Sequence, residues 1–292
     1  GGTDGEAKEI EPITLKAVSG WPDNDINSAG LFVFAEKLKE LSNGAITIDY
    51  LGGPEVIPSN DQGEAVRNGA VDLAWLATSY YSNPIPEATV FLYSDKTWDQ
   101  MRSDGSLDYL NELHHQKLNA HIIGGSPGLI YFLYTNKPVQ SMDDFKGLRI
   151  RVSNAYLAFV KALGAEPVNM PAGEIYNAME KGVIDGLGYA LGVTEWGLED
   201  QIKYKILPSF YQSTVVSIIN YDKWQSFSPE VQEIFIEAAK ATEAETQKLA
   251  EEYLQKEDAI LKEAGVEFVE IAEAEEYVKL AYDAAWEDLK QK

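Results

Sequence analysis

The sequence predicts an α/β fold built from two similar lobes, and three observations lead to this prediction. Strand-like segments alternate with helix-like segments from about residue 13 onward, a pattern typical of α/β proteins with a largely parallel sheet. A helix that ends on a glycine and leads into a short strand with an aspartate occurs twice, at residues 64–72 and 177–186. Near the carboxyl end, a helical pattern runs from Pro229 to Gly265 without a breaker.

The first lobe opens with residues 13–18, whose alternation of apolar and polar side chains indicates a strand. The helix expected next has apolar residues at helical spacing, and Asn43-Gly44 ends it. Gly52-Gly53-Pro54 breaks the second strand. The expected elements of this lobe are strands at 13–18, 45–51 and 71–76 and helices at about 28–41 and 60–68.

The second lobe is expected to begin near Lys137-Pro138, and the long helix follows it. Ser228 as N-cap and Pro229 at the first helical position mark the start of that helix. Its length of about 36 residues corresponds to about 54 Å at ~1.5 Å per residue, which exceeds the width of one lobe. The other expected elements are strands at 148–152, 166–170 and 266–271 and helices at about 154–163 and 274–290.

These elements suggest a division of the chain into three parts. We expect a flexible leader at residues 1–12, a first lobe of residues 13–136 plus about 220–250, and a second lobe of residues 137–219 plus about 251–292. The leader is polar and Gly-rich, and it indicates either the remnant of a removed signal peptide or a trimmed terminus.

Composition excludes several classes of function. The formal net charge of −23 argues against nucleic-acid binding, because phosphate contacts need a basic face. The chain contains no cysteine, so disulfides, thiolate metal sites and cysteine nucleophiles are excluded. No apolar run approaches the roughly 20 residues that span a bilayer.

Two arginines, Arg149 and Arg151, share one face of the strand expected at residues 148–152, and the apolar residues of that strand face the other way. An unpaired charge in a covered sheet is very costly, so each arginine needs an anion beside it. Either the protein or a ligand supplies that anion.

Aromatic residues lie at or just past the ends of several expected strands. Ligands in open α/β sheets bind outside the carboxyl ends of the strands, so these residues predict an aromatic-lined pocket, although each of them could instead serve packing. They are Trp21, Tyr80, Tyr81, Tyr131, Tyr189 and Trp196.

Two other patterns suggest chemistry but fit it poorly. Gly124-Gly125-Ser126-Pro127-Gly128 matches the nucleophile elbow of hydrolases, yet Pro127 lacks the N–H that the oxyanion hole requires. We read these residues as a tight crossover between strands. His114 and His115 point in different directions on a helix and cannot easily share a metal ion. A surface position or a packing role is therefore the preferred interpretation of the histidines, His121 included.

At residues 144–152 the chain resembles the solute-binding proteins of tripartite ATP-independent periplasmic (TRAP) transporters, of the C4-dicarboxylate-binding (DctP) type. The resemblance extends from about Ile13 to Lys290, and its motifs are specific in combination. They are Asn43-Gly44, Leu51-Gly52-Gly53, residues 69–75, 141–152, 162–165, 174–179 and 182–186, and Trp224.

The resemblance implies a two-lobed periplasmic-binding-protein fold, similar to class II, with a ligand cleft and a long helix spanning both lobes. In the family, the last arginine of the motif Lys-Gly-Leu-x-Ile-Arg-Val forms a bidentate salt bridge to the ligand carboxylate, and that role carries onto Arg151. The planar fork of donors of an arginine suits a carboxylate in geometry and charge. Arg149 is expected to pair within the protein.

Two departures from the family pattern bear on the ligand. Members that bind sialic acid or short dicarboxylates often carry a second arginine where this chain has Tyr131. They also often have Gln-Glu-Asn where this chain has Leu187-Gly188-Tyr189. Both changes make the pocket less polar, which favours a monocarboxylate with an aromatic or apolar body.

The resemblance therefore implies an extracytoplasmic solute-binding protein, periplasmic or tethered to the membrane as a lipoprotein, that delivers a carboxylate to TRAP membrane subunits. We expect a monomer without enzymatic activity, metal ion or cofactor. Two other functions stay open, a serine hydrolase that uses Ser126 and a ligand-sensing domain for a signalling partner. The expected ligand-binding residues are Arg151, Tyr189, Tyr131, Trp21, Tyr80, Tyr81, Asn24 and Ser153.

Overall fold

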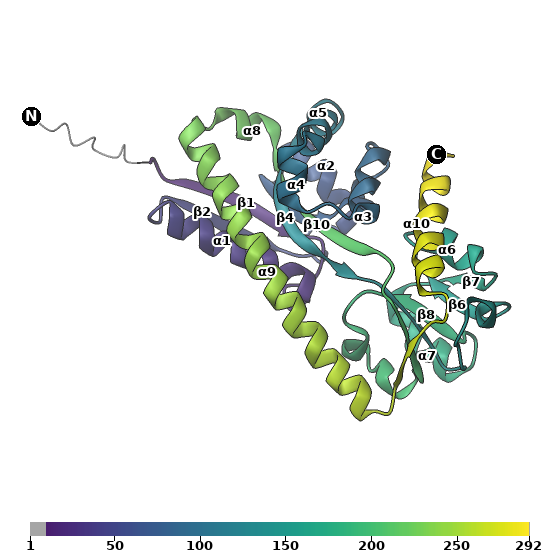
Figure 1. Ribbon diagram of the computed structural model, residues 1–292. Coiled ribbons are helices and arrows are strands. Elements are labelled where there is room, and N and C mark those ends of the chain that lie inside the picture. Colours follow the sequence, from purple (N-terminus) through teal and green to yellow (C-terminus); the bar gives the residue numbers. More distant parts are fainter. Residues whose placement is uncertain (1–9, 292) are drawn as a thin grey trace, which may run out of the picture. The chain divides into compact units, whose positions relative to one another are not determined.

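The structure of the chain, a computed structural model, describes residues 10–291, except for the side chains of residues 127–129 and 212–213. The leader expected at residues 1–12 lies outside the described residues, apart from residues 10–12. The chain divides into two compact units, to which several separate segments contribute (Figure 1). The first unit comprises Gly1–Glu87, Thr97–Ser126 and Val215–Gln247, and the second comprises Ala88–Lys96, Pro127–Thr214 and Lys248–Lys292.

The first unit consists of a sheet and the helices that help to bury its apolar residues. Its strands are β1 (Ile13–Ser19), β2 (Ile46–Gly52), β3 (Leu73–Ala77), most of β4 (Ala120–Ile130) and most of β10 (Gln212–Asn220). Its helices are α1 (Ala29–Leu41), α2 (Gln62–Arg67), α4 (Trp98–Ser103), α5 (Ser106–Leu118), α8 (Tyr221–Ser226) and the first part of α9 (Pro229–Glu263). The strand order is β2-β1-β3-β10-β4, and β1 pairs in parallel with both β2 and β3.

The second unit has its own sheet, with the strand order β11-β9-β5-β8-β6-β7. These strands are β5 (Phe132–Thr135), β6 (Arg149–Val152), β7 (Glu166–Asn169), β8 (Gly186–Tyr189), β9 (Tyr204–Leu207) and β11 (Glu267–Glu270). The helices are α3 (Val90–Tyr93), α6 (Leu157–Ala162), α7 (Ile175–Glu180), the end of α9, and α10 (Ala274–Lys290). The α/β prediction is confirmed in both units.

The helix-to-strand junction predicted as an internal repeat is present in each unit. α2 and α7 end just before Gly69 and Gly182, whose φ angles of +78° and +66° lie in the left-handed region that favours glycine. Three residues later, the carboxylates of Asp72 and Asp185 each accept a main-chain N–H from the neighbouring strand, at 2.8 and 2.9 Å. The repeat therefore fixes the same strand pairing twice.

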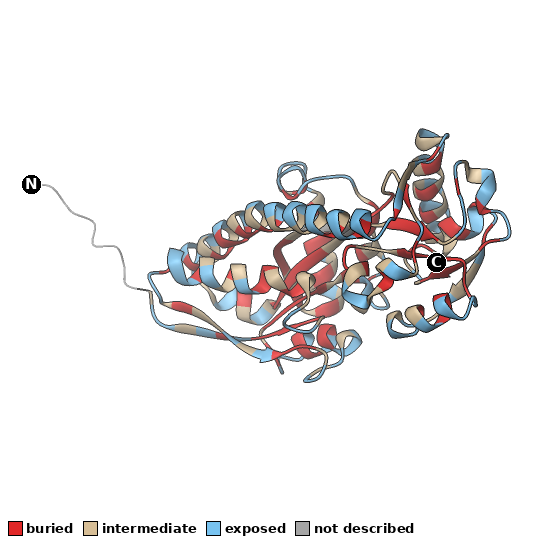
Figure 2. Cartoon of the chain, turned by 90° about the horizontal axis from the view of Figure 1, so that it is seen from below, coloured by how far each residue is buried: buried red, intermediate tan, exposed pale blue. Residues whose placement is uncertain are grey.

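The long helix α9 begins as the sequence predicts and serves both cores. The hydroxyl of Ser228 accepts the main-chain N–H of Val231 at 3.3 Å, which caps the first turn. Phe235 belongs to the core of the first unit and Leu261 to a core of the second, and neither is exposed to solvent. Figure 2 shows how buried and exposed positions alternate along the helices.

The prediction of a largely parallel sheet is only partly correct. β10 runs antiparallel to β3 in the first unit, and β5 runs antiparallel to β8 and β9 in the second. Each of these strands begins within a few residues of a point where the chain passes from one unit to the other. They need no crossover helix of the kind that connects parallel neighbours, because antiparallel pairing does not require one.

Two segments differ from the expected division. Residues 88–96 and 127–136 belong to the second unit, whereas the sequence placed both in the first lobe. The reason is packing, since α3 adds Leu92 and Tyr93 to the core of the second unit. The strand β5 lies between β8 and β9 in the sheet of that unit.

Residues 124–128, expected as a tight crossover, instead continue β4 without a turn. The two glycines here allow close packing: a Cβ on Gly124 would lie 2.6 Å from a carboxylate oxygen of Glu243. A Cβ on Gly125 would overlap the main-chain oxygen of Val215. The glycine pair was misread because glycine marks close approach as well as turns.

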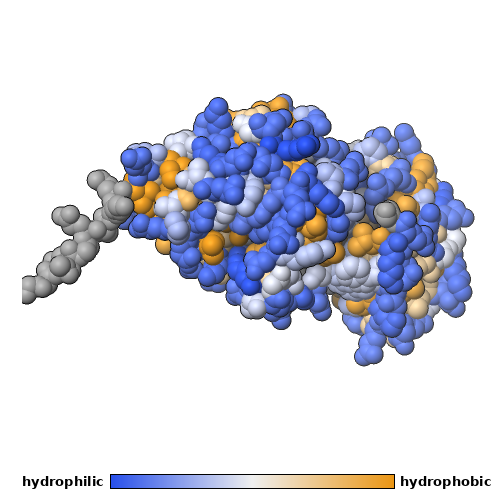
Figure 3. Space-filling model, turned by 90° about the horizontal axis from the view of Figure 1, so that it is seen from above, coloured by the Kyte–Doolittle hydropathy of each residue, from blue (hydrophilic) through white to orange (hydrophobic). Residues whose placement is uncertain are grey.

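In the face that Figure 3 shows, hydrophilic side chains predominate and apolar ones are scattered among them. Within residues 10–291, every helix is too short or too polar to cross a lipid bilayer.

Candidate functional site

Strand β6 carries both arginines into the sheet of the second unit, where it lies between β7 and β8 and pairs in parallel with each. The two side chains differ in their surroundings although residues two apart share a strand face. Arg149 is partly exposed, whereas Arg151 is buried and only 7% exposed. Because Arg151 is buried, the cost of its charge depends on which groups contact its guanidinium.

Arg149 has a partner within the protein, as predicted. Its Nε and Nη2 donate to the two carboxylate oxygens of Asp185 at 3.0 and 2.9 Å, and Lys137 lies 2.8 Å from the same carboxylate. Burial alone would raise the pKa of Asp185, but the hydrogen bonds from Arg149 and Lys137 outweigh it and hold that pKa well below its usual range. Arg149 is therefore structural.

Arg151 has acceptors but no counterion among the described residues. Its Nε donates to the main-chain oxygen of Met170 at 3.0 Å. Its Nη1 donates to the hydroxyl of Tyr156 at 2.8 Å and to the main-chain oxygen of Gly188 at 3.4 Å. Three neutral oxygens orient the guanidinium without neutralising it, and an unneutralised buried cation is costly. An anion beside the guanidinium would supply the missing charge.

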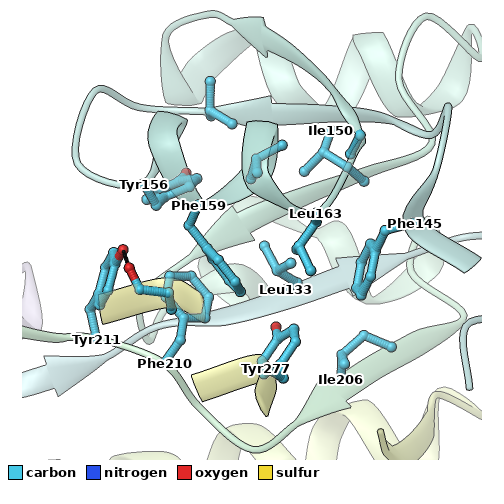
Figure 4. Close-up of a cluster of buried hydrophobic side chains, with 14 of the residues drawn as sticks. Leu133, Phe145, Ile150, Tyr156, Phe159, Leu163, Ile206, Phe210, Tyr211 and Tyr277 are labelled. Atoms are coloured by element: carbon cyan, nitrogen blue, oxygen red, sulfur yellow. Dashed lines mark hydrogen bonds between the residues drawn. The ribbon is translucent and has the colours of Figure 1, made fainter. Parts of the chain in front are cut away.

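Tyr156 fixes the position of the guanidinium. Its hydroxyl accepts a hydrogen bond from Arg151 and donates one to the main-chain oxygen of Gly188. Its ring is 1% exposed and packs near Phe210, with ring centroids 6.0 Å apart (Figure 4). Gly188 makes room for it, because a Cβ there would overlap the Tyr156 ring.

Aromatic side chains from three segments surround this group. The ring of Tyr189, at the end of β8, lies 5.8 Å from the guanidinium carbon of Arg151, within cation–π range. The indole Nε1 of Trp196 donates to the Tyr189 hydroxyl at 2.9 Å. Tyr131 lies 5.5 Å from the ring of Tyr156. The guanidinium thus has one ring, that of Tyr189, within cation–π range, and Tyr131 lies near its hydrogen-bond partner Tyr156.

Comparison with known proteins shows the family of this chain. A family model described as bacterial extracellular solute-binding protein, family 7 (DctP), matches residues 17–291. The chain belongs to this family. The resemblance to TRAP solute-binding proteins is thereby confirmed, and with it the extracytoplasmic location.

Individual relatives of this solute-binding protein are distant. A monocarboxylate 2-oxoacid-binding periplasmic protein of Nostoc sp. is 23% identical over 234 residues, or 76% of this chain but 64% of that protein, which is less than two thirds of its length. The 2,3-diketo-L-gulonate-binding periplasmic protein YiaO of Escherichia coli is 27% identical over 81% of this chain and 74% of its own. A TRAP periplasmic solute-binding protein of Rhodobacter sphaeroides shares the fold, with a TM-score of 0.85 at 22% identity over 96% of this chain and 94% of that one.

Of the expected ligand-binding residues of this solute-binding protein, the structure brings Arg151, Tyr189 and Tyr131 together. Ser153 lies in the turn beside them, and its main-chain oxygen accepts the main-chain N–H of Tyr156 at 3.4 Å. These four residues all belong to the second unit.

The other four expected ligand-binding residues belong to the first unit. Trp21 and Tyr80 pack together with ring centroids 5.6 Å apart, and Asn24 is exposed in the turn before α1. Tyr81 is 3% exposed, and its hydroxyl lies 3.1 Å from Nε2 of His114, so its burial weighs against a ligand contact. A ligand-binding role for these residues stays a prediction.

The histidines serve packing in the first unit. His115 Nε2 and His121 Nδ1 are 2.9 Å apart, and the His121 ring stacks on Trp224 with centroids 4.3 Å apart. Burial lowers the pKa of His114 to about 4 and that of His121 to about 3. Within residues 10–291, no group of His, Asp or Glu side chains is arranged to hold a metal ion.

Sequence reasoning missed Tyr156, Gly188 and the main-chain oxygen of Met170. A signal for Tyr156 existed, because this tyrosine stands five residues after Arg151 and directly before helix α6, so its side chain can return toward the arginine. The main-chain acceptors leave no signal in the sequence, since every residue type offers the same carbonyl oxygen.

Proposed function

We propose that Arg151 binds the carboxylate of the transported solute, and that this solute is a monocarboxylate with an aromatic or apolar body. One observation carries the proposal. Of the buried residues in the described part of the chain, Arg151 and Lys205 are the cations, and Lys205 pairs with Asp258 at 2.7 Å. Arg151 has no such partner among the described residues, so a ligand carboxylate would supply the missing charge.

The hydrogen bonds of Arg151 also limit how a carboxylate can approach. Nε and Nη1 already donate to protein oxygens, which leaves Nη2 as the nitrogen without a partner among the described residues. We expect a carboxylate oxygen to bind Nη2 first. The bidentate contact that the family resemblance implies would also use Nη1 or Nε. That nitrogen would then leave or share its present acceptors, which are the Tyr156 hydroxyl and the Gly188 oxygen for Nη1 and the Met170 oxygen for Nε.

The body of the ligand follows from the aromatic neighbours. Tyr189 and Tyr131 offer ring faces, and the other buried cation in the described part of this unit, Lys205, already pairs with Asp258. A second ligand carboxylate would therefore be buried without a counterion. The name of the Nostoc relative, a monocarboxylate 2-oxoacid-binding protein, agrees with this choice.

The wider role of the protein follows from its family. We infer that the chain acts as a monomer, does not catalyse a reaction, and delivers its ligand to TRAP membrane subunits. A hydrolase based on Ser126 finds no support, because residues 124–128 continue a strand and do not form a nucleophile elbow.

Isothermal titration calorimetry tests the proposal. Phenylpyruvate and 4-methyl-2-oxopentanoate should bind more tightly than succinate and malate. Arg151→Gln should weaken the binding of the two monocarboxylates by about 100-fold, because it removes one partner of a buried charge pair. Arg67→Gln, at an exposed arginine of the first unit, is the matched control and should bind as the wild type does. Unchanged affinity in Arg151→Gln would show that the site is elsewhere.

A further inference from the structure

Helix α9 reaches the turn beside the arginine site through Glu257, a carboxylate that is 1% exposed. Its Oε1 accepts the main-chain N–H groups of Gly192 and Thr194 at 2.9 and 3.3 Å, and the Thr194 hydroxyl lies 3.5 Å from it. These residues, like the end of α9, belong to the second unit. A side chain of the long helix thus holds the turn that follows β8.

The same helix holds this turn at a second point. Tyr253 lies one helical turn before Glu257, and its hydroxyl donates a hydrogen bond to the carboxylate of Glu195 at 2.5 Å. The turn itself, Val193–Trp196, ends on Trp196, whose indole N–H donates to the hydroxyl of Tyr189. Consecutive contacts therefore lead from α9 to the ring that lies beside the guanidinium of Arg151.

The burial of the Glu257 carboxylate costs free energy of folding. Its Oε2 is buried and has no hydrogen-bond partner, and the buried hydroxyl of Tyr134 has none either. Burial raises the pKa of Glu257, although the N–H groups of Thr194 and Gly192 oppose that shift. A buried polar atom without a partner calls for an explanation beyond packing, because an apolar side chain would avoid its cost.

We propose that Glu257 is a positioning residue of the carboxylate site. It holds the turn Val193–Trp196 in place, and through Trp196 it fixes the position of the Tyr189 ring. This inference rests on the proposed function, since it assigns to α9 the selection of ligands with a ring body. Loss of the Glu257 carboxylate should leave the hydrogen bonds of Arg151 unchanged and make the position of the Tyr189 ring less fixed.

Hydrogen–deuterium exchange provides a test that needs no ligand. In Glu257→Ala, the amides of Gly192 and Thr194 lose their acceptor, so peptides covering residues 189–197 should exchange faster than in the wild type. Glu252→Ala, at an exposed position of the same helix, is the matched control and should exchange normally. Glu257→Gln keeps an acceptor oxygen and should restore most of the protection. Unchanged exchange in Glu257→Ala overturns the proposal.

Ligand binding separates positioning from a purely structural role. Glu257→Ala should weaken phenylpyruvate binding by about fivefold, the size of a lost aromatic contact, and pyruvate binding by less than twofold. If exchange rises but both affinities are unchanged, or fall equally, the positioning role is wrong. If Glu257→Ala does not fold, Trp196→Phe removes the indole donor to Tyr189 and must give the same selective loss.

The two proposals fail in distinguishable ways. Wild-type protein that binds neither acid contradicts the proposed function, and the exchange of residues 189–197 then decides alone whether Glu257 holds the turn. Wild-type protein that binds both acids, with Glu257→Ala showing equal losses, contradicts the positioning role alone.

Discussion

Val18 of β1 occupies in the first unit the position that Arg151 occupies in the second. In each unit the aspartate of the repeated junction accepts a main-chain N–H from the residue two positions before Val18 or Arg151. The donors are Lys16 at 2.8 Å and Arg149 at 2.9 Å. Both Val18 and Arg151 are buried, at 0% and 7% exposure. The repeat thus has an apolar residue at this position in the first unit and a cationic residue in the second.

Tyr156→Phe tests how the guanidinium is held. The substitution removes a hydroxyl that both accepts from Arg151 and donates to Gly188. It should lower the free energy of unfolding by about 1–3 kcal/mol, because buried polar groups lose their partners, and it should weaken carboxylate binding. Urea denaturation and calorimetry check the two effects. A variant with full stability and affinity would show that Tyr156 does not orient Arg151.

Gly188→Ala tests the space beside the same tyrosine. Its Cβ would overlap the Tyr156 ring, so we expect a loss of about 1–3 kcal/mol of stability, with weaker ligand binding. Gly173→Ala is the control, because a Cβ at that position meets no atom within 4 Å. Equal melting temperatures for the two variants would contradict the close packing.

Asp185→Asn tests the structural role of the Arg149 pair. The folded-state pKa of Asp185 lies below its unfolded value of about 3.9, so the pair contributes stability above that pH, and this contribution is lost as the pH falls. The variant should lose about 1–2 kcal/mol at pH 7, a modest figure because Arg149 and Lys137 are partly exposed. Its deficit relative to the wild type should shrink at pH 3.5 in urea titrations. A deficit that does not change with pH would contradict the assignment.

His121→Gln tests the buried histidines of the first unit. The folded-state pKa of His121, lowered to about 3 by burial, lies below the unfolded value of about 6.5. Its contribution to stability is therefore full above pH 6.5 and falls as the solution is acidified, by at most about 1.4 kcal/mol per pH unit. Between pH 7.5 and 5 the variant should lose less stability than the wild type. Parallel losses would mean that His121 is not buried in its neutral form.

The elements with strong local signals could be predicted from the sequence. Ser228-Pro229 located the start of α9, and the glycines at positions 69 and 182 located the ends of two helices. The antiparallel strands and the course of residues 124–128 could not be predicted, because they depend on segments distant in the sequence. Gly125, for example, is explained only by the main chain of Val215.

The candidate site likewise has parts that the sequence predicts and parts that it does not. The strand pattern and the family motif pointed to Arg151, and the pairing of Arg149 within the protein followed from the cost of an unpaired charge. Gly188 and the Met170 carbonyl could not be predicted, since a main-chain oxygen is common to all residues. Glu257 was hidden among the many acidic residues of α9, and only its burial distinguishes it.

The way the chain passes between its units affects the order in which the protein can be completed during synthesis. The last segment of the first unit, Val215–Gln247, is made after most of the second unit, and the second unit still needs Lys248–Lys292. A growing chain therefore holds two unfinished cores until residue 247 is available. Exposed apolar strands favour aggregation, and charge repulsion between copies of this highly acidic chain opposes it.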